Sequence, residues 1–206
     1  MMKLYYSDVL APRKACAVAK YLQAPVAFIY LDMTRGEHKA PSYVALNPNG
    51  KVPTLTNGER ILWEADAIMC ELSDLTGADL WPHDSRQLDI IRWFSWNAQH
   101  FYPQGGALYF EHIVKSRFAL GDPDPAVVER ALEGFRKFAA VLDNHLKGRK
   151  WLVGENPTVA DFSVAVTLPY AGRASMPLDE FPEIRRWHDQ LNAFAAWREP
   201  FPARPN

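Results

Sequence analysis

The first third of the chain alternates between hydrophobic patterns typical of strands and patterns typical of helices. Residues 3–6 are a short β-prone run, residues 15–22 are rich in Ala, and residues 26–31 form an apolar run of buried-strand length. Pro12 stands where a helix could begin, and Pro25 ends that helical segment. Two strands joined by a helix form a βαβ unit, whose strands should be parallel.

A hairpin and a second helix follow. Residues 52–56 and 60–63 flank Asn57-Gly58, and Asn-Gly between apolar runs is the strongest short hairpin signal. Glu64 then opens a helical segment over residues 65–75. Together these elements predict a compact α/β unit with a mixed four-stranded sheet.

Beyond this unit the patterns are helical. Residues 76–85 are typical of a linker, and residues 86–118 predict one long helix that bends near Pro103. Alternating Asp and Pro at 122–125 interrupt the pattern before a second long amphipathic helix over residues 126–146.

Two shorter helices are expected, one from Thr158 and one from about Phe181. Thr158 is a good N-cap residue, and Asp161, three residues later, can reach back to it as a shorter relative of the capping box. We assign this pair a role in folding. The second part of the chain is therefore predicted to be all α.

Composition narrows the class of protein. The chain is 48% hydrophobic and 23% charged with a formal net charge of −1, which excludes intrinsic disorder and argues against binding to nucleic acid. Neither a secretory signal nor a membrane-spanning apolar run is evident, so we expect a cytoplasmic protein without membrane attachment. Cys16 and Cys70 form no disulfide framework, and the His and Cys residues lack ligand spacing, so no metal is expected.

Two stretches carry candidate chemistry. A cis bond before Pro53 would turn the backbone of Val52 outward toward an extended peptide-like ligand, although a trans proline at a strand edge explains the same residues. Glu64 stands where a strand meets a helix N-terminus, a combination suited to the ammonium and carboxylate of an amino acid. Ordinary helix-start charge is the alternative at this second stretch.

An ordered set of segments resembles one known family. Gly36-Glu37-His38-Lys39-Ala40-Pro41, the stretch 46–55 and Glu64-Ala65-Asp66-Ala67-Ile68 are similar to the glutathione-binding half of a cytosolic glutathione S-transferase, in a spacing closest to phi-like and related bacterial members. Residues 151–161 and 181–187 resemble helical segments of its second domain. The resemblance implies a thioredoxin-like domain over residues 1–77 and an all-α domain over residues 85–206.

The resemblance also implies a glutathione site. Pro53 would be cis, and the backbone of Val52 would pair with the cysteinyl part of glutathione. Glu64 and the helix start at Ala65 would hold the γ-glutamyl end. The cations near the glycyl carboxylate would be His38, Lys39 and Lys51. For His38 and Lys39 a solvated loop is the alternative.

Two departures from the family pattern matter. Ala65 stands where the family usually has Ser, which removes one hydrogen bond worth ~0.5–1.5 kcal/mol. Where a Ser or Cys would stabilise the glutathione thiolate, the chain has Val9, Leu10 or Ala11. Tyr6 and Ser7 remain as candidates for the catalytic contact with the thiol.

The aromatic residues of the long helix are the candidates for a second subsite. By resemblance, Trp96, His100 and Tyr109 would help to form an apolar pocket for the electrophile, with core packing and a dimer contact as the alternatives.

The resemblance therefore implies a transferase that conjugates glutathione, as co-substrate, to small hydrophobic electrophiles, acting as a homodimer. Two other functions share the same tripeptide site. One is a glutathione-binding or regulatory protein with little transferase activity, and the other is a glutathione-dependent reductase, dehalogenase or isomerase.

Overall fold

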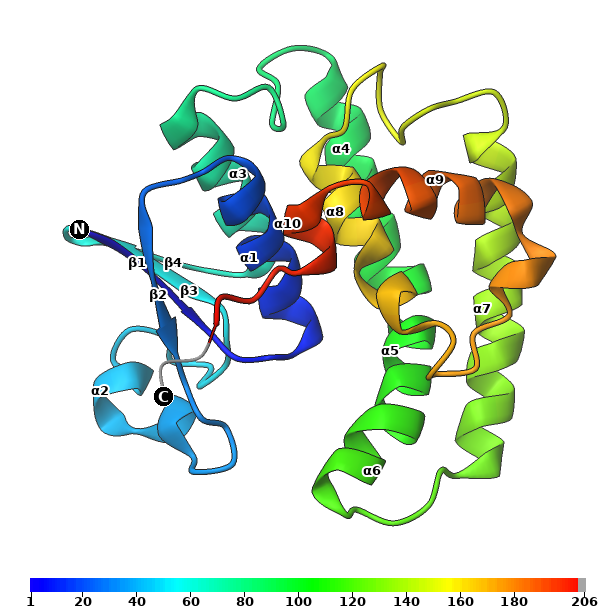
Figure 1. Ribbon diagram of the computed structural model, residues 1–206, viewed down its shortest axis with the longest axis horizontal. Coiled ribbons are helices and arrows are strands. Elements are labelled where there is room, and N and C mark those ends of the chain that lie inside the picture. The colour runs from blue at the N-terminus through cyan, green and yellow to red at the C-terminus, as the bar shows by residue number, and fades with distance from the viewer. Residues whose placement is uncertain (204–206) are drawn as a thin grey trace. The chain divides into compact units, whose positions relative to one another are not determined.

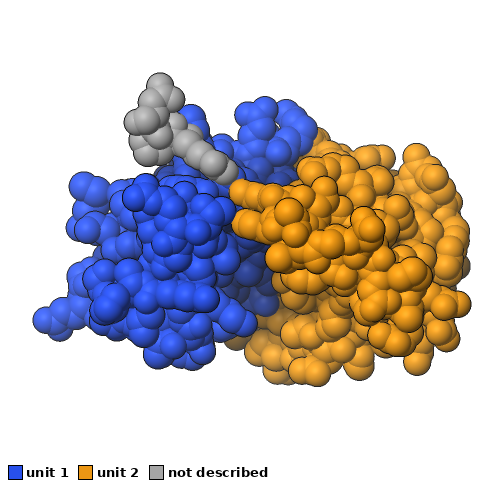
Figure 2. Space-filling view, turned by 90° about the horizontal axis from the view of Figure 1, so that it is seen from below, with its two compact units in different colours: residues 1–81, 194–206 blue, residues 82–193 orange. Residues whose placement is uncertain are grey.

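A computed structural model gives the structure of the chain and describes residues 1–203. The chain forms two compact units, one of Met1–Trp81 with the C-terminal segment that begins at Phe194, and one of Pro82–Ala193 (Figure 2). Each unit is described by itself.

The first unit contains a four-stranded sheet in the order β2-β1-β3-β4 (Figure 1). The strands are β1 (Met2–Tyr6), β2 (Val26–Tyr30), β3 (Thr54–Asn57) and β4 (Arg60–Trp63). β1 and β2 are parallel, as the βαβ pattern predicts, and the other two pairs are antiparallel. The predicted hairpin is confirmed, because Asn57 pairs with Arg60 across a turn in which Gly58 has φ 61°.

Helices α1 (Leu10–Tyr21) and α3 (Ala65–Thr76) pack against each other and against the sheet. Residues Ala15 to Ala19 of α1 are small and fully buried, and they lie in the same core as Leu4 and Leu55 of the sheet and Ile68 of α3. The shorter turns η1 (Glu37–Lys39) and α2 (Pro41–Val44) connect β2 to β3, and α3 ends where Gly77 takes a left-handed conformation.

The C-terminal segment belongs with this unit, not with the helical domain in which the sequence pattern places it. Helix α10 (Ala195–Arg198) packs on α1, where Arg13 donates a 2.6 Å hydrogen bond to the Trp197 carbonyl. Beyond α10, the ring of Phe201 stacks on Tyr6. The second compact unit of the structure is thus Pro82–Ala193, whereas the sequence predicts a helical domain over residues 85–206. Residues 204–206 of the predicted domain lie outside the described residues.

The second unit is all helical, as predicted. Its helices are α4 (Arg86–Trp96), η2 (Asn97–Phe101), α5 (Tyr102–Tyr109), η3 (Phe110–Val114), α6 (Lys115–Phe118), α7 (Pro125–Leu146), α8 (Val159–Val164), η4 (Ala165–Tyr170), η5 (Leu178–Glu180) and α9 (Pro182–Asn192).

The segment from Arg86 to Phe118 is continuously helical, but two stretches, η2 and η3, are π-helical. The first of these wider turns ends two residues before Pro103, which has no N–H and would clash with a carbonyl of the preceding turn in a regular α-helix. Further along, a Cβ at Gly105 would lie 2.6 Å from Thr167 Oγ1, so the absence of a side chain lets α5 approach η4 closely.

Every residue of α8 is buried, as expected for a helix at the centre of a bundle. Asp161 reaches back to the Thr158 N–H at 2.8 Å, which confirms the predicted capping box. Its carboxylate also accepts hydrogen bonds from the Thr158 hydroxyl, the Leu152 N–H and the Trp187 indole. The carboxylate therefore holds a loop, a helix start and α9 together.

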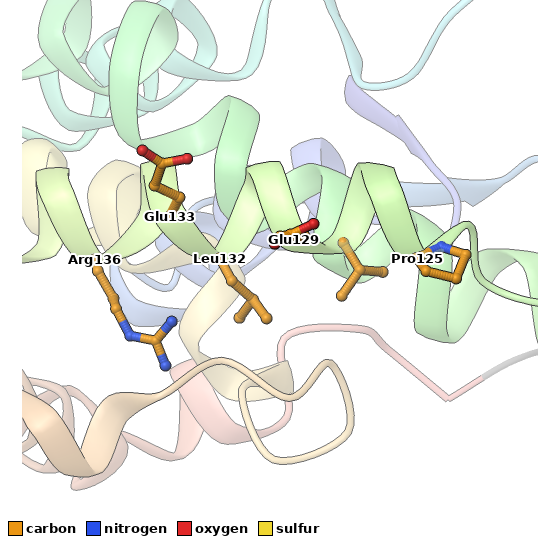
Figure 3. Close-up of a pocket in the computed structure, with 6 residues that line it drawn as sticks. Pro125, Glu129, Leu132, Glu133 and Arg136 are labelled. Carbon is orange, nitrogen blue, oxygen red and sulfur yellow. The ribbon is translucent and has the colours of Figure 1, made fainter.

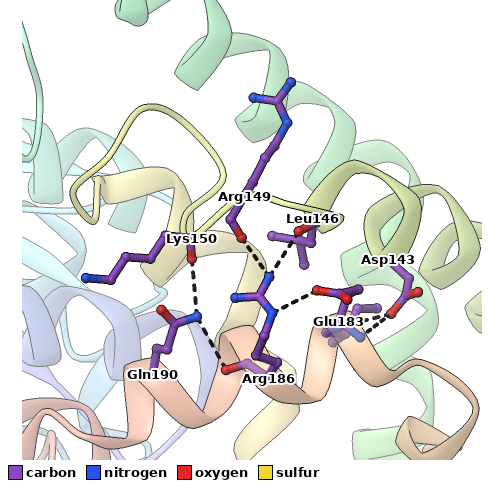
Figure 4. Close-up of polar contacts among 8 residues, drawn as sticks. Asp143, Leu146, Arg149, Lys150, Glu183, Arg186 and Gln190 are labelled. Carbon is purple, nitrogen blue, oxygen red and sulfur yellow. Dashed lines mark hydrogen bonds and ion pairs between the residues drawn. The ribbon is translucent and has the colours of Figure 1, made fainter.

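Helices α7 and α9 cap each other (Figure 4). Asp143 of α7 accepts hydrogen bonds from the first N–H groups of α9, at Glu183 and Ile184. In return, Arg186 of α9 donates to the Leu146 carbonyl at the end of α7 and to the Arg149 carbonyl just beyond it. Each helix thus satisfies the terminal groups that the other leaves open.

Candidate functional site

The register of the sheet brings three segments to one edge of the first unit. Thr54 at the start of β3 pairs with Trp63 at the end of β4 and with Tyr5 near the end of β1. The residues before Thr54, after Trp63 and after Tyr6 therefore all meet at this edge. They are the loop that ends in Val52-Pro53, the start of α3 and the turn into α1.

The Val52–Pro53 peptide bond is cis, which confirms the expectation from the sequence resemblance. Val52 lies outside the β3–β4 ladder, which begins with Thr54 and Trp63. Its backbone is thus placed next to the sheet edge without being part of a strand pair, as a docking site for an extended peptide requires.

A buried polar cluster holds this loop in place. Asn47 Nδ2 and the Tyr43 hydroxyl donate to the Lys51 carbonyl at 2.7 and 2.6 Å. Both also contact Thr54 Oγ1, which is fully buried. Burial raises the pKa of Tyr43, so its hydroxyl stays protonated as a donor. Sequence reasoning did not select Tyr43 or Asn47, although Asn47 lies within the stretch 46–55 that it singled out.

The predicted cations lie near the same loop. Gly50 has φ 57°, and a Cβ there would lie 3.4 Å from the His38 carbonyl, so η1 and the loop are neighbours. The His38 ring is half-buried, and among the described residues nothing forms a hydrogen bond with its buried Nδ1. Lys39 and Lys51 are exposed. These three residues can therefore face an anion at one end of the site.

The start of α3 provides the other end. Glu64 precedes the helix with φ 72° and ψ 118°, a conformation that costs a non-glycine residue of order 1–3 kcal/mol. Its side chain is exposed and makes no capping hydrogen bond. Ala65 follows as the first helical residue, so the open N–H groups of the first turn come directly after a carboxylate. This arrangement suits a zwitterionic group.

The two predicted catalytic hydroxyls lie inside the unit. Tyr6 is 1% exposed, and its ring packs among Phe28, Tyr30 and Phe201. Ser7 is 4% exposed and donates its hydroxyl proton to the Leu31 carbonyl at 2.8 Å. Neither hydroxyl is presented at the surface in this arrangement. A catalytic role for either stays a prediction.

The turn into α1 offers a different donor for a thiolate. Val9 is the N-cap and makes no side-chain capping bond, and Leu10 and Ala11 supply the first helical N–H groups. The next residue, Pro12, has no N–H, so the open donors are confined to these positions. The positive end of the helix dipole adds to their effect on an anion.

The predicted electrophile-pocket residues divide into two groups in the second unit. Trp96 and His100 both pack on Phe138 of α7, whereas Tyr109 packs on Tyr170 of η4. Trp96 also lines a depression of about 210 Å³ between α4 and α7. Burial raises the pKa of Tyr109 to about 12. Within this unit, the structure does not bring the three residues into one pocket.

A second, more open depression follows one face of α7 between Pro125 and Arg136 (Figure 3). All the residues that line it belong to this one helix, with Leu132 between the charged side chains of Glu129 and Glu133. At its end, Arg136 pairs with Glu180 at 2.9 Å.

Among the described residues there is no group of three or more His, Cys, Asp or Glu side chains placed to hold a metal ion. No helix in residues 1–203 is long and apolar enough to cross a membrane.

Comparison with known proteins decides the family. Residues 3–70 match the glutathione S-transferase N-terminal domain, and residues 125–190 match the glutathione S-transferase C-terminal domain. A probable glutathione S-transferase of Oryza sativa subsp. japonica is 34% identical over 202 residues, covering 93% of this chain and 92% of that protein. This chain belongs to the glutathione S-transferase family. Glutathione S-transferase 3 of Zea mays is 32% identical over 182 residues, covering 85% of this chain and 81% of that protein.

The fold agrees with this assignment. Glutathione transferase F7 from Populus trichocarpa superposes with a TM-score of 0.87 at 21% identity, over 97% of each chain. The family assignment and the superposition confirm the predicted thioredoxin-like and all-α folds.

Proposed function

We propose that this chain is a glutathione transferase that joins the sulfur of glutathione to small hydrophobic electrophiles. The observation that carries the proposal is the backbone of Val52, which lies outside the β3–β4 ladder and, by the sheet register, beside the start of α3. The membership of the family supports the same activity.

Glutathione is a tripeptide with a carboxylate at each end and an ammonium group on its γ-glutamyl residue. The backbone of Val52 pairs with the cysteinyl part, and the N–H groups at Ala65 receive the γ-glutamyl carboxylate while Glu64 receives the ammonium group. The glycyl carboxylate lies near His38, Lys39 and Lys51. One ligand then contacts the exposed cations of the loop at one end and the open first turn of α3 at the other.

In the proposed reaction, the thiol loses its proton to solvent and the resulting thiolate is stabilised by the Leu10 and Ala11 N–H groups at the start of α1. The thiolate attacks an electrophilic carbon, a C–S bond forms, and the leaving group departs with its electron pair. The apolar electrophile is proposed to contact either the group of Trp96 and His100 or Tyr109, because the three residues do not share one pocket. We further propose a cytoplasmic homodimer, for which light scattering in solution should give the mass of two chains.

The test is retention on immobilised glutathione followed by turnover of glutathione with chlorodinitrobenzene. We expect retention and a steady rate of thioether formation. Glu64→Gln should raise the KM for glutathione, whereas the matched change Glu59→Gln, on an exposed turn, should leave it unchanged. Retention without turnover of several electrophiles would favour a glutathione-binding protein, in keeping with the burial of Tyr6 and Ser7. Failure to bind glutathione would refute the proposal.

A glutathione-dependent thiol exchange that uses a cysteine of this chain has less support. Burial raises the pKa of Cys16 well above its ordinary value and that of Cys70 to about 12, so neither forms a thiolate near neutral pH.

A further inference from the structure

An ion pair stands at the first turn of α3. Lys14, on the second turn of α1, places its Nζ 2.6 Å from Oδ1 of Asp66, the second residue of α3. The lysine side chain is 9% exposed and the aspartate side chain 29% exposed, so solvent screens the pair only partly. The two helices that carry these residues pack side by side (Figure 1).

Asp66 creates an electrostatic problem for an anionic ligand. A helix N-terminus carries the equivalent of roughly +0.5 elementary charge, which favours an anion. Here the carboxylates of Glu64 and Asp66 flank Ala65, and together they outweigh that partial charge. Ala65 adds no hydroxyl donor of its own. Without a compensating cation, the first turn of α3 would repel a carboxylate.

We propose that Lys14 is a positioning residue for the γ-glutamyl end of glutathione. By neutralising Asp66, it keeps the start of α3 able to bind a carboxylate while Glu64 stays available for the ammonium group. This inference rests on the proposed glutathione site. A purely structural link between α1 and α3 would not need these two charges, because a buried ion pair is no more stabilising than well-packed apolar side chains.

The test is calorimetric titration with S-methylglutathione, which binds without reacting. Lys14→Met should weaken binding by about tenfold, equivalent to ~1.4 kcal/mol, because Asp66 is then unneutralised. Asp66→Asn should bind at least as well as the wild type. The double variant, which has neither charge, should regain most of the lost affinity, and Lys14→Arg should retain it. The loss in Lys14→Met should shrink as salt is raised.

A second ligand separates recognition from stability. S-methylcysteinylglycine lacks the γ-glutamyl group, so its weaker binding should be the same in the wild type and in Lys14→Met. A purely structural link predicts instead that the affinity for both ligands follows the melting temperature in every variant, the double variant included. That result would overturn the inference.

The two proposals fail in different ways. If the wild type does not bind S-methylglutathione, the proposed function is wrong. If the wild type binds it and folded Lys14→Met binds it equally well, only the role of Lys14 is wrong. Should Lys14→Met not fold, Asp66→Asn decides, because a several-fold weaker affinity in that variant contradicts the electrostatic role and an equal or tighter affinity supports it.

Discussion

Replacement of Asp161 by Ala should be among the most destabilising single changes in the helical unit. The carboxylate is fully buried and accepts four hydrogen bonds, from the Leu152 N–H, the Thr158 N–H, the Thr158 hydroxyl and the Trp187 indole. Burial raises the pKa of the Asp161 carboxyl, and the four hydrogen bonds lower it by less than burial raises it. The change leaves all four donors buried without an acceptor.

The magnitude follows from those donors. Each orphaned buried donor costs ~1–3 kcal/mol, so the loss should be at least ~4 kcal/mol, which is a large part of a typical stability of ~5–15 kcal/mol. Thr158→Val removes one donor to the carboxylate and the hydroxyl that caps the Asp161 N–H, and should cost about 1–2 kcal/mol. Asp179→Asn, at an ion pair whose aspartate is 93% exposed, should change stability very little.

Urea unfolding followed by tryptophan fluorescence measures these losses, because Trp187 itself reports on the site. The expected order of stability is wild type close to Asp179→Asn, then Thr158→Val, then Asp161→Ala. A loss below about 1 kcal/mol for Asp161→Ala would refute the reasoning that these four hydrogen bonds organise the unit.

Three further predictions concern titration, thiol chemistry and ligand affinity. Burial lowers the pKa of His145, so as the pH falls through about 6.5 the unfolded chain takes up this proton before the folded one, and the helical unit loses stability. His145→Gln should flatten that part of the pH–stability curve measured by thermal unfolding. An unchanged slope would show that His145 does not cause this loss of stability. Because burial raises the pKa of Cys16 and Cys70, iodoacetamide near neutral pH should leave both thiols unmodified in folded protein, as mass spectrometry can check. Ala65→Ser should tighten glutathione binding by up to about tenfold, since it adds a hydroxyl at the first turn of α3; an unchanged affinity would mean that the first turn does not contact the ligand.

Local signals in the sequence were sufficient for much of the fold. Asn57-Gly58 predicted the hairpin, whose two turn residues are Gly58 and Glu59, with Gly58 supplying the positive φ that the turn requires. Thr158 with Asp161 predicted a helix start from an equally local signal. The cis bond at Pro53 could not be predicted from a local signal. The dipeptide alone is ambiguous, and only the ordered family resemblance indicated the cis form that is found.

The face of the sheet on which a strand side chain lies could not be predicted from local signals. Strand alternation states that Tyr5 and Tyr6 face opposite ways, but not which of them faces the core. That choice depends on the C-terminal segment, because Phe201 stacks on Tyr6 and closes the interior around it. Tyr5 instead packs against Tyr43, beside the loop that holds Val52. The contact between Lys14 and Asp66 likewise depends on how α1 and α3 pack, which neither helix encodes alone.

The central claim is that glutathione lies along the sheet edge formed by Val52-Pro53, the start of α3 and the start of α1. Titration of isotope-labelled wild-type protein with glutathione, followed by amide NMR, tests it most directly. The account predicts that the amide signals of Val52, Ala65 and Ala11 shift together and saturate at one common affinity. Saturable shifts confined to the depressions on α4 and α7, with these three amides unmoved, would contradict it.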